Sequence, residues 1–211
     1  MMKEKRIVLL KEIKKNKYKY MFLITIILIG FIMGIIFSNI LSYNDHQQIS
    51  EVLKKYFLCI KNNQDINYLN NFINNFSVNY LYMLAIWIFG LSIIGIILNP
   101  FILYLKSFII GLSVGVIIST YGLIGIIGVI LYIFPHVLIN LIIYLLLSFY
   151  GIKLSINLFK ALFLKKNFNS SEFMHKYLVI LGLSALILLI TTLYETFLAD
   201  FVMKLFTILL K

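Results

Sequence analysis

Apolar residues fill two long stretches of the chain that contain no charged side chain. Residues 66–105 form a first stretch of 40 residues, and after Lys106 residues 107–152 form a second stretch of 46. A helix needs about 20 apolar residues to cross the hydrocarbon core of a bilayer. With the apolar segments nearer each end of the chain, the pattern predicts five membrane-spanning helices, over residues 20–40, 79–98, 101–120, 123–151 and 177–199.

The composition agrees with a chain that is mostly surrounded by lipid. Hydrophobic residues make up 62% of its 211 residues and charged residues only 13%, whereas a soluble domain carries about 25% charged residues. The longest segment between spans, 41–78, is shorter than most domains that fold alone. We therefore expect a single integral membrane domain over residues 1–211, an all-α polytopic bundle of about five transmembrane helices.

The basic residues are concentrated in segments that alternating spans place on one side of the membrane. The tail 1–19 holds eight of the 19 Lys and Arg residues and the loop 153–176 holds five, and such an excess marks cytoplasmic segments. We predict a cytoplasmic N-terminus, an extracytoplasmic C-terminus and a cytoplasmic turn at Asn99-Pro100. Lys106 is expected near that interface, with its ammonium group reaching towards water. With Lys106 included, fourteen basic residues are predicted on the cytoplasmic side and five on the outer side.

The net charge of +11 follows from this topology and does not indicate a nucleic-acid partner, because no nucleic-acid-binding motif accompanies it. The basic tail is instead expected to contact anionic membrane lipid.

The segment 41–78 carries two apolar stripes at helical spacing. The first runs from Ile49 to Ile60 and the second from Leu69 to Phe76, with apolar residues every three or four positions. They predict two amphipathic helices in the first outer loop, which either lie on the membrane and bundle or bind an extracytoplasmic partner. The candidate docking residues are Ile49, Val52, Leu53, Lys54, Lys55, Tyr56, Phe57, Phe72 and Phe76.

Glycine pairs four residues apart occur at Gly30 and Gly34 and again at Gly111 and Gly115. Glycines at this spacing lie on one helix face and allow a second helix to approach closely. We expect them to pack neighbouring spans of the same chain, with a homodimer interface as the alternative.

The fourth predicted span contains Pro135-His136 near its middle. A proline inside a helix removes a backbone hydrogen bond and is expected to kink it. Tyr132, His136, Asn140 and Tyr144 recur every four residues and form one polar stripe. The stripe either holds helices together by hydrogen bonds or handles a proton or ligand within the membrane.

The acidic residues near the C-terminus do not suggest catalysis. Glu195 is predicted at the outer interface, about 28 Å along the last helix from Lys176, and Asp200 is expected to pair with Lys204. No G-x-S-x-G, H-E-x-x-H or phosphate-binding loop occurs in the sequence. The three histidines are predicted at three different depths and so cannot share a metal. We expect neither an enzyme nor a protein with a cofactor.

The segment Leu81–Gly115, LYMLAIWIFGLSIIGIILNPFILYLKSFIIGLSVG, closely resembles the corresponding part of the stage II sporulation protein M family. The resemblance continues in order through the basic tail, NNFSVNY (Asn74–Tyr80), FPH (134–136) and YGIKLS (150–155), and so covers nearly the whole chain. Many members carry an acidic residue four positions after the histidine. This chain has Asn140 there, which argues against ion coupling through the stripe.

The resemblance implies a multi-pass membrane protein of endospore-forming bacteria. It would act where the mother-cell membrane engulfs the forespore, as a non-enzymatic anchor for two peptidoglycan-degrading partners, the stage II sporulation proteins D and P. The family assigns no catalytic residues. The alternative suggested by the residues themselves is a small transporter or permease subunit that uses the kinked helix at Pro135 and His136.

Overall fold

The structure is a computed structural model that describes residues 16–42, 44, 45, 47–52, 55, 67–165 and 170–198, without the side chains of Tyr132, Ser170, Glu172 and Leu198. All regular structure in these ranges is helical. The elements are α2 (Lys17–Ile40), α4 (Tyr68–Gly90), α5 (Gly95–Gly128), the π-helical turn η1 (Val129–Ile133), α6 (Phe134–Leu164), α7 (Ser170–Leu193) and the π-helical turn η2 (Tyr194–Leu198).

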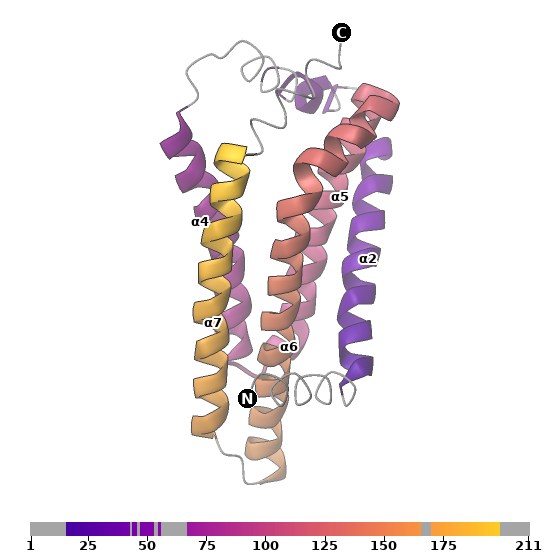
Figure 1. Cartoon of the computed structure of the whole chain (residues 1–211). Helices are drawn as coiled ribbons and strands as arrows, with labels where there is room; N and C mark the ends of the chain where they lie inside the picture. Colours follow the sequence, from indigo (N-terminus) through magenta and orange to yellow (C-terminus); the bar gives the residue numbers. More distant parts are fainter. Residues whose placement is uncertain are drawn as a thin grey trace.

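Five helices run side by side along one axis and form a bundle (Figure 1). Each is long and apolar enough to cross a membrane: Lys17–Ile40, Tyr68–Gly90, Gly95–Leu131, Phe134–Leu164 and Phe173–Phe197. The predicted number of spans is therefore confirmed, while several of their boundaries differ from those expected.

One boundary difference lies in α4, which begins eleven residues before the predicted start of the second span. Residues 68–76 form the first turns of this helix rather than a separate amphipathic helix in the outer loop. The chain then turns at residues 91–94, so the turn predicted at Asn99-Pro100 is wrong. Pro100 lies within α5, and Asn99 on the same helix is fully buried.

Helix α5 bends at Gly122, whose φ of 60° and ψ of −138° are not helical, and the third span continues beyond this bend to Leu131. Positive φ is readily available only to glycine, which explains why the chain can bend there. After the bend, a short helical stretch leads into η1, in which the amide of Phe134 bonds to the carbonyl of Val129. Pro135 follows in the first turn of α6, so the predicted helix irregularity is present, at the start of α6 rather than at its middle.

Helices α6 and α7 include most residues of the predicted loop 153–176. Helix α6 continues to Leu164 and ends at Lys165 in a left-handed conformation, and α7 begins at Ser170. Lys153 and Lys160 therefore lie on α6, and Lys176 lies on α7. These basic residues still lie near one end of the bundle, as the predicted topology requires.

The bundle presents apolar side chains outwards and several polar ones inwards. Ile97, Leu162 and Ile190 are 73%, 67% and 63% exposed, which is favourable only if lipid covers them. The core lies among the five helices and contains Leu23, Met83, Ile86, Leu103, Ile143, Tyr144, Leu147, Phe149, Leu154, Tyr177 and Leu188.

Helix α2 packs mainly against α5, and the two glycine pairs form this interface. A Cβ atom at Gly30 would lie 2.7 Å from the carbonyl oxygen of Tyr104, and one at Gly34 would overlap that of Phe108. From the other side, a Cβ at Gly111 would overlap the carbonyl oxygen of Phe31. The expectation that the pairs pack neighbouring spans of one chain is confirmed. The close backbone approach leaves no room for side chains there.

Hydrogen bonds join α4, α6 and α7 at the lower end of the bundle. The Tyr177 hydroxyl on α7 donates to the carbonyl oxygens of Ile86 and Trp87 on α4, at 3.3 and 3.2 Å. The Ser155 hydroxyl on α6 lies 3.1 Å from the carbonyl oxygen of Gly90. Carbonyl groups at the end of α4 thus gain partners that lipid cannot supply.

Candidate functional site

The predicted polar stripe of α6 faces the inside of the bundle. His136, Asn140 and Tyr144 are 5%, 4% and 0% exposed, while the side chain of Tyr132 is outside the part that the structure describes. Buried polar groups are expected to find partners, because an unsatisfied group in lipid costs several kcal/mol. The stripe meets side chains from α4, α5 and α7, which together form a polar cluster within the membrane.

The lower part of the cluster centres on Asn79 of α4. The Tyr144 hydroxyl lies 3.1 Å from the backbone oxygen of Asn79 and 3.2 Å from its side-chain oxygen Oδ1. The ammonium group of Lys106 on α5 donates to the same Oδ1 at 3.1 Å. It also lies 4.4 Å from the centre of the Tyr82 ring, within the range of a cation–π contact. One asparagine therefore links α4, α5 and α6.

The upper part of the cluster joins α6 to α7 and η2. The Thr191 hydroxyl donates to Oδ1 of Asn140 at 2.7 Å. One helical turn closer to the start of α6, Nε2 of His136 lies 3.7 Å from Oε1 of Glu195. Glu195 exposes only 17% of its side chain and belongs to η2. It lies near the end of the last span, as predicted, but is turned into the bundle.

The position of Lys106 differs from the sequence-based expectation. It was expected near a cytoplasmic turn, but it lies eleven residues after the first residue of α5 and its ammonium group contacts Asn79 inside the bundle. Without Lys106, the predicted cytoplasmic side still holds thirteen basic residues against five. The predicted orientation therefore does not depend on this lysine.

Sequence reasoning missed three members of the cluster, namely Asn79, Thr191 and the inward-facing Glu195. Part of the signal was present, since Lys106 is the only charged residue between positions 66 and 152. An isolated charge in a long apolar stretch indicates a buried polar partner. The identity of the partner was not readable, because Asn79 is 27 positions away in the sequence.

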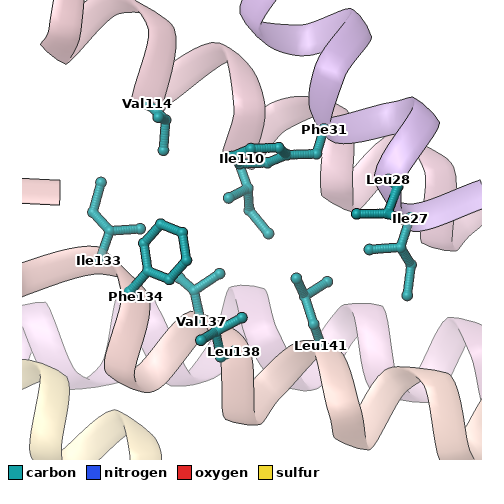
Figure 2. Close-up of a pocket in the computed structure, with 10 residues that line it drawn as sticks. All are labelled: Ile27, Leu28, Phe31, Ile110, Val114, Ile133, Phe134, Val137, Leu138 and Leu141. Carbon is teal, nitrogen blue, oxygen red and sulfur yellow. The ribbon is translucent and has the colours of Figure 1, made fainter. Parts of the chain in front are cut away.

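The opposite face of α6 is apolar and borders a pocket shared with α2 and α5. The pocket has a volume of about 180 Å³. Figure 2 shows its lining side chains, all of which are hydrocarbon. They are Ile27, Leu28, Phe31, Ile110, Val114, Ile133, Phe134, Val137, Leu138 and Leu141. This pocket offers no hydrophilic route along α6.

The predicted docking residues fall into two groups. Phe72 and Phe76 lie on α4, half-buried, and stack with ring centres 5.9 Å apart. Ile49, Val52 and Lys55 belong to a helical segment that precedes α4, and Val52 is 67% exposed. Leu53, Lys54, Tyr56 and Phe57 lie outside the described residues, as does the predicted pair of Asp200 and Lys204.

The cluster brings ionisable side chains from different helices into contact with polar partners. A lysine, a histidine and a carboxylate lie inside the bundle, where Lys106 donates to Asn79 and His136 faces Glu195. Among the described residues, no group of three or more His, Cys, Asp or Glu side chains is placed to hold a metal ion. The cluster can join four helices, and its hydrogen bonds within lipid give the bundle specific contacts.

The fold and the cluster define a polytopic, all-helical membrane protein. The sequence profile of the stage II sporulation protein M family matches residues 22–200. The chain belongs to this family, which makes it a sporulation-related membrane protein. No curated protein and no solved structure matches the chain.

Proposed function

We propose that the protein is a non-enzymatic membrane anchor of the engulfment machinery in endospore formation. In this role it recruits the peptidoglycan-degrading stage II sporulation proteins D and P to the engulfing mother-cell membrane. The observation that carries the proposal is the family match over residues 22–200. The family is one of sporulation membrane proteins, and its members are not known as enzymes.

The architecture is compatible with an anchoring role. The buried polar side chains of α6 bond to α4 and α7, and Lys106 joins α5 to the same asparagine of α4, so these contacts stabilise the bundle. The candidate surface for an external partner is the helical segment around Val52 and Lys55, both exposed, together with Phe72 and Phe76 of α4. The exposed Val52 and Lys55, with the half-buried rings of Phe72 and Phe76, suit a partner with apolar and acidic groups.

Co-purification from sporulating cells tests the anchoring role directly. The tagged full-length protein, extracted in mild detergent, is expected to retain protein D or protein P. The proposal is refuted if neither partner is retained and engulfment proceeds normally in cells that lack the gene.

The docking surface is tested by the double substitution Val52→Asp and Lys55→Glu. We expect a loss of about tenfold or more in partner recovery, because apolar contact and charge complementarity are both removed. Fluorescence microscopy of a labelled hydrolase measures its localisation in the same cells. Lys165→Glu, at the opposite end of the bundle, is the matched control and should leave localisation unchanged. Unchanged localisation in the double variant would assign docking to other surfaces, such as the transmembrane faces.

A transport function is the second candidate, because Lys106, His136 and Glu195 bring ionisable side chains into the membrane interior. Such residues often mark substrate or proton pathways. The apolar lining of the pocket beside α6 (Figure 2) provides no such pathway at that face. We therefore rank transport below anchoring.

The variant His136→Ala distinguishes the two functions. If the protein anchors hydrolases, the variant should keep their localisation as long as it accumulates to the normal level, measured by immunoblot. If it transports a solute, a growth-linked flux should be lost at a normal protein level. Thr192→Val is the control, because its hydroxyl donates to the carbonyl of Leu188 in its own helix, at 2.8 Å.

A further inference from the structure

A second pocket lies at the end of the bundle where α2 begins, on the side that the charge bias predicts to be cytoplasmic. Its volume is about 370 Å³, within the range of about 300–1,000 Å³ typical of ligand sites. Residues from three helices line it: Tyr18, Lys19, Phe22 and Leu23 of α2, Ile96 of α5, and Phe149, Ile152 and Ile156 of α6.

The floor of this pocket is buried and apolar, and the aromatic side chains at its rim are exposed. Leu23 and Phe149 are each 1% exposed, and the Phe149 ring stacks on Tyr20 with centres 4.1 Å apart. Tyr18 and Phe22 at the rim are 86% and 57% exposed. A hydrocarbon chain entering from the side would therefore meet a preformed apolar surface.

Lys19 lines this pocket, and Lys153 follows the lining residue Ile152 on α6. Lys19 of α2 lies close enough to Lys153 and Lys160 of α6 for their charges to repel one another. The Lys153 ammonium group lies 5.1 Å from the centre of the Phe173 ring and 5.9 Å from that of Tyr150, which holds it at this end of the bundle. An anion placed among the three lysines would relieve their mutual repulsion.

We propose that this pocket binds a diacyl phospholipid with an anionic headgroup. The headgroup phosphate lies among Lys19, Lys153 and Lys160, and an acyl chain lies against Phe22, Phe149 and Ile152. Basic pockets between transmembrane helices on the cytoplasmic side are known to bind anionic headgroups. The combination of a lysine cluster and an adjacent apolar groove suits a lipid better than either a free anion or a neutral lipid. The bound lipid would bridge α2 and α6, which make few direct contacts with each other.

The test uses the full-length protein in non-ionic detergent, titrated with dioleoyl phosphatidylglycerol or dioleoyl phosphatidylcholine. Binding is measured by native mass spectrometry and by the shift in thermal unfolding temperature. We expect phosphatidylglycerol to bind at least tenfold more tightly than phosphatidylcholine. Equal affinities, or equally tight binding of soluble glycerol 3-phosphate, would overturn the proposal, since the first removes the charge requirement and the second the acyl-chain requirement.

Variants place the lipid in this pocket rather than at the bundle surface in general. Lys19→Gln and Lys153→Gln should each weaken phosphatidylglycerol binding about fivefold, the effect expected of one basic residue near anionic lipid. Lys17→Gln makes the same charge change on the same helix but outside the lining, and should have less than a twofold effect. An equal loss in Lys17→Gln would show diffuse attraction and refute the site.

The substitution Ile152→Trp tests the groove without changing any charge. The larger side chain should fill the space that the acyl chain needs and weaken phosphatidylglycerol binding at least tenfold. Size-exclusion chromatography and circular dichroism check that the variant is folded. If a folded Ile152→Trp protein binds phosphatidylglycerol as the unchanged protein does, the groove is not the site. If the variant does not fold, the lysine variants decide the question.

Discussion

Replacement of Gly34 by leucine is expected to destabilise the protein more than any other single change considered above. A Cβ atom at this position would overlap the carbonyl oxygen of Phe108 and lie 2.7 Å from the amide nitrogen of Leu112. These are backbone atoms of α5, so no side-chain rotation can make room. Overpacking of this kind costs about 3 kcal/mol when the helices must move apart. For a chain of this size, that corresponds to a fall of roughly 10 °C in the unfolding temperature.

Gly182→Leu is the matched control for this substitution. Gly182 lies on α7 with nothing within 4 Å of where its Cβ atom would be, and leucine favours the helix more than glycine does. The unfolding temperature of each detergent-purified variant and its level in the membrane are measured side by side. A similar fall in the unfolding temperature of both variants would show that any larger side chain on these helices lowers stability, and that the α2–α5 interface is not the cause.

Replacement of Asn79 by leucine is expected to have the second-largest effect. The change removes the acceptor that the Lys106 ammonium group uses at 3.1 Å, whereas Tyr144 keeps the backbone oxygen at position 79 as its partner. A buried charge without its hydrogen-bond partner costs about 2–3 kcal/mol. The unfolding temperature should therefore fall by several degrees.

A double-mutant cycle with Lys106→Met isolates this contact. Methionine removes the charge that requires a polar partner. The double variant Asn79→Leu, Lys106→Met should therefore lose less free energy of unfolding than the sum of the losses in the two single variants. The expected coupling is about 1–2 kcal/mol, within the range for residues in direct contact. Additive losses would mean that Lys106 obtains its stabilisation from other groups, such as the Tyr82 ring or Glu195.

The features that could be predicted from the sequence are those that depend on local spacing. Five apolar segments, the four-residue glycine pairs and the inward stripe through His136, Asn140 and Tyr144 all follow from helical periodicity and are present in the structure. The start of α4 was missed because residues 69–76 were assigned to a separate amphipathic helix of the outer loop, and the second span was expected to begin at residue 79. In the structure these residues share a continuous helix with the second span.

The features that could not be predicted depend on contacts between distant positions. Asn79 bonds to Lys106 and Tyr144, which are 27 and 65 positions away, and no repeat in the sequence relates these three residues. The inward direction of Glu195 likewise depends on where η2 places it relative to His136. The helical rise gives the distance of Glu195 from Lys176 along the last helix, but not the helix face on which Glu195 lies.

The pairing of α2 with α5 has a consequence for the order in which the protein is made. Helix α2 is synthesised before α4, yet its glycine face fits α5. A ribosome that adds about 5–20 residues per second needs roughly 4–15 s to proceed from Gly34 to Gly111. During that interval the nascent α2 must reside in the bilayer without the helix that fits it, and the crowded glycine interface can form only after a second helix has already been inserted.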